Sequence, residues 1–121
     1  MAKEREDYTK PANTFIGKGI KLQAKKLTGA ESVRIDGHFV GDIDLDGYLQ
    51  LGETGRVEGN IHVSYALIAG QVGGGIQCRA TVHLASGSVV VGDIVCEKIV
   101  IDDGAIIRGF VKTRGAQQES L

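Results

Sequence analysis

Val57-Glu58-Gly59-Asn60-Ile61 is one copy of a five-residue pattern that recurs through most of this chain. The pattern is an apolar residue, a spacer, a glycine, a spacer and an aliphatic residue, and its other copies lie at 39–43, 72–76, 90–94 and 107–111. Successive copies are 18, 15, 18 and 17 residues apart, measured between their central glycines, which are Gly41, Gly59, Gly74, Gly92 and Gly109. A pattern that returns at a nearly constant interval predicts a solenoid, in which each repeat forms one turn and stacks on its neighbours.

Composition agrees with a β-rich solenoid that forms a single domain. Glycine supplies 18 of the 121 residues and proline only one, so the chain is neither collagen-like nor a proline-rich linker. Hydrophobic residues make up 42% of the sequence and are mostly valine, isoleucine and leucine, which favour strands. Glycines placed once per repeat indicate positions where the backbone bends or where two backbones come close.

Apolar and polar residues alternate within each repeat, in short runs separated by corners such as Asp36-Gly37. Alternation with a period of two is typical of strands, and no stretch carries the period and end signals of a helix. The same order of apolar positions returns in every repeat, so we expect parallel stacking, with Val57 near Val72 and Ile61 near Ile76. The sequence therefore predicts an all-β parallel β-helix of about six rungs, roughly 29 Å long at ~4.8 Å per rung.

Strict alternation also assigns inward and outward positions after the corner of the second clear repeat and in the degenerate first repeat. Strict alternation predicts that Leu67 and Ala69 continue the inward row of the repeat that begins at Val57. In the degenerate first repeat, it places Ala24 at the glycine position and Lys26 at the aliphatic position. A left-handed hexapeptide helix is the nearest competing architecture, but the steps of 15 and 17 residues break the regular count that it requires.

The chain divides into a domain and two tails. Residues 1–13 are densely charged and are expected to form a disordered tail, residues 14–113 the β-helix domain, and residues 114–121 a second short disordered tail. We find no apolar signal-peptide core and no apolar run of transmembrane length, which favours a cytoplasmic location. A net charge of −1 and the absence of tryptophan argue against nucleic-acid binding.

Side chains that could act as metal ligands or nucleophiles are few, and the sequence does not bring them together. His62 and His83 are expected to face solvent on different strands and His38 lies at a corner, so the histidines do not form a zinc ligand set. Cys78 and Cys96 share an inward position in adjacent repeats, close enough for a disulfide, although buried free thiols are favoured. With no catalytic, cofactor-binding or metal-binding residue to assign, the sequence predicts a protein that is not an enzyme and needs no cofactor.

The two ends of the predicted rod are its unusual surfaces, because solenoids normally carry polar caps. No capping helix is predicted at either end. Five apolar residues of the terminal repeats are therefore the candidates for a polymer interface: Ile107, Phe110, Val111, Phe15 and Ile16. Phe110 falls at an outward position, where it either folds over its own end or contacts a second rod. Near the first repeat, a solvated face is favoured over an anionic contact for the basic cluster of Lys18, Lys21, Lys25 and Lys26.

These repeats and their flanking motifs resemble those of the bactofilins over residues 14–113. The resemblance rests on Phe15-Ile16-Gly17-Lys18-Gly19, Val33-Arg34-Ile35-Asp36-Gly37, the repeated glycine pattern and Val100-Ile101-Asp102-Asp103-Gly104-Ala105. It implies a bacterial cytoskeletal protein with a right-handed, three-sided β-helix between short disordered tails. It also implies polymerisation without nucleotide, through end contacts, into non-polar filaments that help to set cell shape.

Partners and membrane contact follow from the resemblance less directly. The family implies cell-wall enzymes or membrane-associated scaffold proteins as partners besides the chain itself. Many bactofilins bind the inner face of the membrane through an N-terminal segment, but residues 1–13 lack an apolar start. Two other hypotheses stand beside the polymer: a non-polymerising β-helical adaptor that recruits a protein partner, and a relative of the acyltransferases or zinc carbonic anhydrases, in which a zinc site or clefts between subunits are expected.

Overall fold

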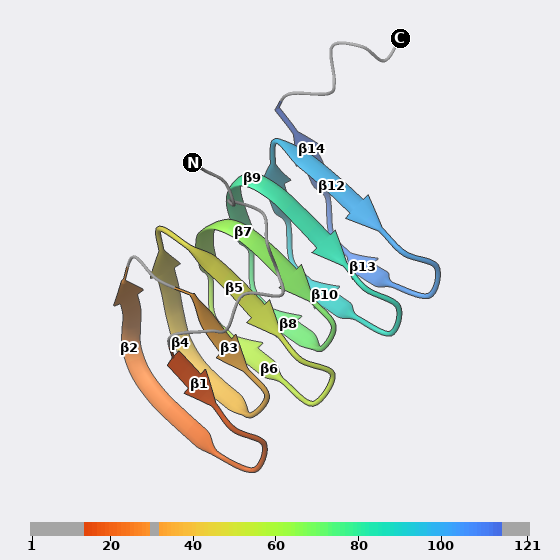
Figure 1. The fold of residues 1–121 in the computed structure, drawn as a ribbon. Coiled ribbons are helices and arrows are strands. Elements are labelled where there is room, and N and C mark those ends of the chain that lie inside the picture. Colours follow the sequence, from red (N-terminus) through yellow and green to blue (C-terminus); the bar gives the residue numbers. More distant parts are fainter. Residues whose placement is uncertain (1–13, 30–31, 115–121) are drawn as a thin grey trace, which may run out of the picture.

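The computed structural model describes residues 14–29 and 32–114, which form strands and no helix (Figure 1). Every strand pairing between them is parallel. No helix in this part of the chain is long and apolar enough to span a membrane. The predicted disordered tails lie outside the described residues, apart from Arg114. The strands are β1 (Thr14–Ile16), β2 (Lys21–Gly29), β3 (Val33–Ile35), β4 (His38–Leu45), β5 (Tyr48–Leu51), β6 (Arg56–Glu58), β7 (Ile61–Ile68), β8 (Gln71–Gly73), β9 (Ile76–Leu84), β10 (Val89–Val91), β11 (Ile94–Cys96), β12 (Lys98–Ile101), β13 (Ile106–Arg108) and β14 (Val111–Thr113).

The strands stack on three faces, which we call A, B and C. Face A contains β1, β3, β5, the second halves of β7 and β9, and β12. Face B contains the first halves of β2 and β4, then β6, β8, β10 and β13. Face C contains the second halves of β2 and β4, the first halves of β7 and β9, then β11 and β14.

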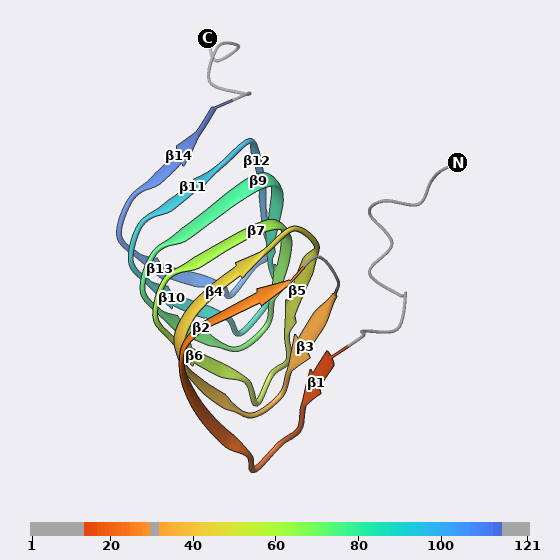
Figure 2. The same ribbon diagram turned by 90° about the vertical axis from the view of Figure 1, so that its left-hand side faces the viewer.

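One pass through faces A, B and C makes one rung, and the rod has about six rungs, which we number from the N-terminus. Figure 2 shows them as stacked loops. The parallel β-helix that the sequence predicts is therefore confirmed. Val57 pairs with Val72 and Ile61 with Ile76, as the repeat predicts. Stacking like on like buries the inward side chains of the internal rungs almost completely, with Phe39, Leu49 and Ile94 each 0% exposed.

The repeat glycines lie at the corner between faces B and C, one above another. Their φ angles run from +142° to +156°, a region that only glycine enters readily. A Cβ atom on any of the five would lie well under 3.0 Å from the carbonyl oxygen of the residue below it in the stack. Glycine is required here for two reasons, because the backbone bends and because the preceding rung passes directly beneath it.

Corner length explains why the repeat varies between 15 and 18 residues. The corner between faces A and B holds four residues where β5 meets β6, at 52–55, but only two, 69–70, where β7 meets β8. The corner between faces C and A holds two residues at 46–47 and one at Ser64. The flat faces keep a nearly constant length, so insertions change the corners and leave the stacking register intact.

The structure corrects both details of the strict alternation. Ala66 and Ile68 point inward at 0% exposure, whereas Leu67 is partly exposed, because the one-residue corner at Ser64 shifts the alternation by one position. In β2 the pairing passes from Gln23–Val40 to Lys26–Asp42, which leaves Ala24 and Lys25 opposite Gly41. This β-bulge moves the inward position from Lys26 to Leu27, which pairs with Ile43 and packs against the core.

Two arginines form hydrogen bonds between rungs that are two apart, along the corner between faces C and A. The Arg79 guanidinium donates to the Leu45 carbonyl oxygen at 3.1 Å and pairs with Asp46. The Arg114 guanidinium donates to the Cys78 carbonyl oxygen at 3.0 Å. Each arginine reaches past the one-residue corner of the rung between, so Arg79 helps to hold rungs 2 to 4 in register and Arg114 helps to hold rungs 4 to 6.

We predict that Gly74→Ala destabilises the rod by about 2–3 kcal/mol, because the methyl group meets the Gly59 carbonyl oxygen at an unfavourable φ. For a domain of this size, that loss lowers the melting temperature by roughly 10–20 °C. The matched control is Gly73→Ala, since a Cβ atom at the neighbouring Gly73 has no atom within 4 Å. Thermal melts followed by circular dichroism compare the two variants; equal melting temperatures would contradict the proposed role of the glycine column.

Candidate polymer contacts at the two ends of the rod

The C-terminal end exposes side chains that are buried in every internal rung. Ile101 pairs with Leu84, and Val111 pairs with Ile94. Leu84 and Ile94 are 0% exposed, whereas Ile101 is 48% and Val111 38% exposed. The candidate Ile107 also points inward and is partly buried against the core. The described residues therefore end in an open apolar surface, with the strand edges of β12, β13 and β14 beside it.

Phe110 is the most exposed large apolar side chain of the described residues, at 78%. Its backbone is held firmly, because its N–H donates to Asp93 Oδ1 at 3.0 Å and its carbonyl oxygen accepts from the Ile94 N–H at 2.8 Å. The ring does not fold over the end of its own rod. Of the two alternatives left by the sequence, this exposure favours contact with another molecule.

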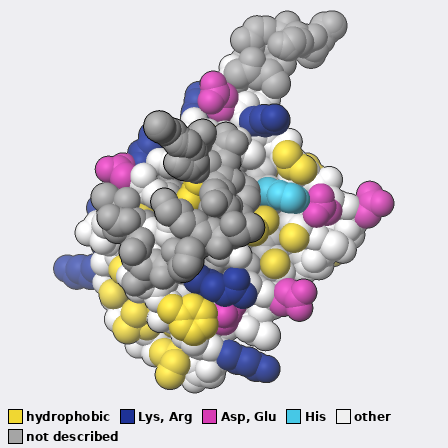
Figure 3. Space-filling view, viewed as in Figure 1, with side chains coloured by type: hydrophobic (Ala, Val, Ile, Leu, Met, Phe, Trp, Pro, Cys, Tyr) yellow, Lys and Arg dark blue, Asp and Glu magenta, His cyan; other side chains and the backbone are white. Residues whose placement is uncertain are grey.

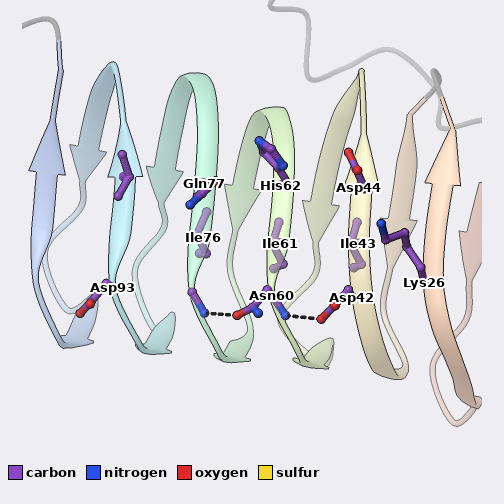
Figure 4. A pocket seen from close by; sticks show the side chains of 12 residues that line it. Lys26, Asp42, Ile43, Asp44, Asn60, Ile61, His62, Ile76, Gln77 and Asp93 are labelled. Atoms are coloured by element: carbon purple, nitrogen blue, oxygen red, sulfur yellow. Dashed lines mark hydrogen bonds between the residues drawn. The ribbon is translucent and has the colours of Figure 1, made fainter.

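Asp93 belongs to a row of side chains beside the glycine column, drawn in Figure 4. Asp42 Oδ1 accepts from the Asn60 N–H at 3.0 Å, and Asn60 Oδ1 accepts from the Gly75 N–H at 3.1 Å. Each side chain thus satisfies a backbone donor of the next rung. No single residue type repeats along this row, because Asp and Asn supply the same carbonyl-type acceptor.

A shallow groove of about 500 Å³ runs along this part of face C, lined by Asp42, Asp44, His62 and Gln77 among others. Two of its lining oxygens, from Asp42 and Asn60, are already bound to backbone N–H groups. The groove is therefore better explained by the bonding between rungs than by a ligand.

The N-terminal end of the rod also exposes apolar side chains. Phe15 is 61%, Ile20 55% and Leu22 42% exposed, although Leu22 pairs with Phe39, which is 0% exposed. The candidate Ile16 differs from its neighbours, because it is only 7% exposed and belongs to the core. Figure 3 shows hydrophobic side chains gathered over β1 and β2, with Lys and Arg side chains beside them. The four lysines of this rung form no ion pair with another described residue.

The three histidines lie on different strands, and His38, which the sequence places at a corner, is the first residue of β4. His38 Nε2 lies 2.9 Å from Glu58, His83 Nε2 lies 3.1 Å from Asp102, and His62 is exposed on face C. Within residues 14–29 and 32–114, no group of three or more His, Cys, Asp or Glu side chains is placed to hold a metal ion.

The two cysteines are free and buried in the core of face C. Burial raises the pKa of the Cys78 thiol to about 11, and burial raises the pKa of Cys96 as well. The Cys78 thiol donates to the Ser64 carbonyl oxygen at 2.9 Å. Both groups are therefore neutral packing residues near pH 7, which agrees with the expectation from sequence.

Comparison with known proteins finds sequence similarity to one family over most of the chain. A sequence model of the bactofilin family, described as polymer-forming cytoskeletal, matches residues 14–112. Bactofilin BacP of Myxococcus xanthus (strain DK1622) is 34% identical over 110 residues, which are 91% of this chain and 45% of BacP. Bactofilin BacO of the same organism is 38% identical over 100 residues, which are 83% of this chain and 79% of BacO. The chain thus spans less than half the length of BacP, and no solved structure matches significantly.

The raised pKa values predict that neither cysteine reacts with a thiol-specific chromogenic reagent at pH 8 while the rod is folded, and that both react once guanidinium unfolds it. The unfolded thiol titrates near 9.0 and folded Cys78 near 11, so its contribution to stability is present below pH 9 and is lost as the pH rises toward 11. Rapid labelling of the native protein would contradict the buried, neutral assignment.

Proposed function

The chain belongs to the bactofilin family of polymer-forming cytoskeletal proteins, and from this premise we propose that its rod is the subunit of a filament built by end-to-end contact. The observation that carries the proposal is the pair of open ends. Side chains equivalent to fully buried core residues are exposed in the last rung, and the strand edges beside them can continue the ladder into a second rod. No nucleotide takes part in this assembly, because the contact is made by apolar side chains and backbone edges.

The proposed filament is non-polar, with C-terminal ends meeting each other and N-terminal ends meeting each other. Each junction is then a two-fold contact between identical surfaces, and two different two-fold contacts build an open chain. Phe110 and Val111, supported by Ile107, form the C-terminal contact, and Phe15 contributes to the N-terminal contact. Ile16 acts through the core rather than through the interface, since it is buried.

In the cell, the proposed role is a cytoplasmic scaffold that positions cell-wall machinery and helps to set cell shape. Its partners are further copies of the chain and, through the sides or tails of the rod, cell-wall enzymes or membrane-associated scaffold proteins. Such a scaffold works at the inner face of the membrane. The resemblance to the family supports this role, and the described residues supply the assembling rod.

We predict that Phe110→Arg stops assembly at dimers. A charged residue at the C-terminal contact is costly to bury, but it leaves the N-terminal contact intact. Phe15→Arg is expected to leave dimers of the opposite kind, and the double variant monomers. Sedimentation velocity without nucleotide distinguishes these species, and circular dichroism confirms that each variant is folded.

The matched control is Gln77→Arg, an exposed position on face C in rung 4, separated from the terminal strand β14 by β11, which is expected to assemble like the unmodified chain. Monomers from each single variant would indicate head-to-tail contacts and contradict the non-polar arrangement. Unchanged filaments from both single variants would contradict end-to-end contact through these residues. A small species for every protein at all concentrations would favour the non-polymerising adaptor.

A further inference from the structure

Face B carries a row of outward residues that differ sharply from rung to rung. Within β6, β8, β10 and β13, the register places four residues in one column: Glu58, Gly73, Val91 and Arg108. The column therefore reads acid, no side chain, aliphatic and base along the axis of the rod, from rung 3 to rung 6. In reverse order, each residue of the column meets a complementary one: the base meets the acid, and the aliphatic side chain meets the position without a side chain.

Gly73 leaves a hollow that the fold does not require. Unlike Gly74, it has no left-handed φ, and a Cβ atom built on it meets no atom within 4 Å. The hollow has a volume of about 110 Å³ and is lined by Val72, Val89 and Val91 together with polar side chains of the neighbouring strands. Directly above it in the column, Val91 stands out from the face at 48% exposure.

We propose that face B is a lateral contact between two antiparallel rods. The two-fold axis lies along the strand direction, between rungs 4 and 5. This operation places each residue of the column opposite the residue at the mirrored rung of the second rod. Val91 of each rod then enters the Gly73 hollow of the other, and Arg108 of each meets Glu58 of the other, so every contact occurs twice.

The charges of these residues agree with this arrangement. Arg108 is exposed and forms no ion pair with another described residue. Glu58 Oε2 lies 2.9 Å from His38 Nε2 and 3.3 Å from Arg56 Nε, and 43% of the Glu58 side chain is accessible. A guanidinium offers several donors that a carboxylate can accept while it retains other partners.

Parallel rods fit this face less well. A two-fold axis along the rod would place Arg56 opposite Glu58 of the second copy, which is favourable. It would, however, place the Gly73 hollow opposite Gln71 and Val91 opposite Val89, so the hollow would stay unfilled by an aliphatic side chain. Only the antiparallel arrangement uses both the hollow and the projection.

The area of the proposed lateral contact is too small for two single rods to pair stably. Strands of three residues and four rungs cover an area on the order of 200 Å² per rod, whereas a stable complex buries about 800 Å² on each partner. Single rods are therefore not expected to pair. Filaments repeat the contact along their length, and repetition makes weak contacts effective, so this inference rests on the proposed end-to-end assembly.

Negative-stain electron microscopy of filaments made from the full chain tests the proposal. The unmodified chain is expected to form filaments paired side by side. Gly73→Leu, which fills the hollow, and Arg108→Glu, which sets two acids against each other, are each expected to give single filaments. Exchange of the two charges, Glu58→Arg with Arg108→Glu, is expected to restore pairing. The control Lys112→Glu reverses an exposed charge of the same rung on face C and should leave pairing unchanged.

Filament formation and filament pairing are separate readouts. Unpaired filaments from the unmodified chain, or pairs that survive both Gly73→Leu and Arg108→Glu, would overturn the lateral contact while end-to-end assembly stands. Pairing that is lost in Arg56→Glu but kept in Arg108→Glu would overturn the antiparallel arrangement in favour of parallel rods. A complete absence of filaments from every protein would overturn end-to-end assembly and this proposal with it.

Discussion

The close approach of successive backbones at the corner between faces B and C is the constraint on which the rest of the rod depends. Each repeat glycine lies over the carbonyl group of the residue below it, at a distance that no side chain permits. That residue is Ala24 for Gly41 and the preceding repeat glycine for the other four. Because this corner has the same geometry in each of these rungs, the flanking strands start in the same register. Inward aliphatic side chains then stack on their own equivalents, and the side-chain oxygens of Asp42, Asn60 and Asp93 reach the backbone N–H groups of the next rung.

A stack built in this way contains no signal of its own for where to end. In the last rung, Ile101 and Val111 occupy the positions that Leu84 and Ile94 occupy in the rung before. No following rung of the described residues covers Ile101 and Val111, so they are exposed. Hydrophobic burial gained by the next rung is the same whether that rung belongs to the same chain or to another. The proposed end-to-end assembly would thus continue the forces that fold the rod, and its specificity would come from the residues that differ at the ends, Phe110 above all.

The sequence predicted the faces of the rod better than its corners. Glycine spacing and period-two alternation were sufficient to pair Val57 with Val72 because both depend on the flat strands, which repeat faithfully. Leu67 was misassigned because a corner can lose one residue without disturbing the stack, and the alternation after it then shifts. At Ala24 and Lys25 the corner instead gains one residue, and the alternation after it shifts as well. Alternation also placed Phe110 at an outward position. The burial of Ile16 and the hollow at Gly73, however, depend on neighbouring rungs in three dimensions, which no local pattern encodes.

The central claim is that rods join end to end in alternating orientation. The most direct measurement is the axial repeat of filaments assembled from the purified chain without nucleotide, obtained from averaged electron micrographs. A rung spacing of ~4.8 Å predicts about 29 Å per rod and therefore a repeat of roughly 58 Å for alternating rods. A repeat of about 29 Å would contradict the alternating orientation, and separate particles at every concentration would contradict end-to-end assembly itself.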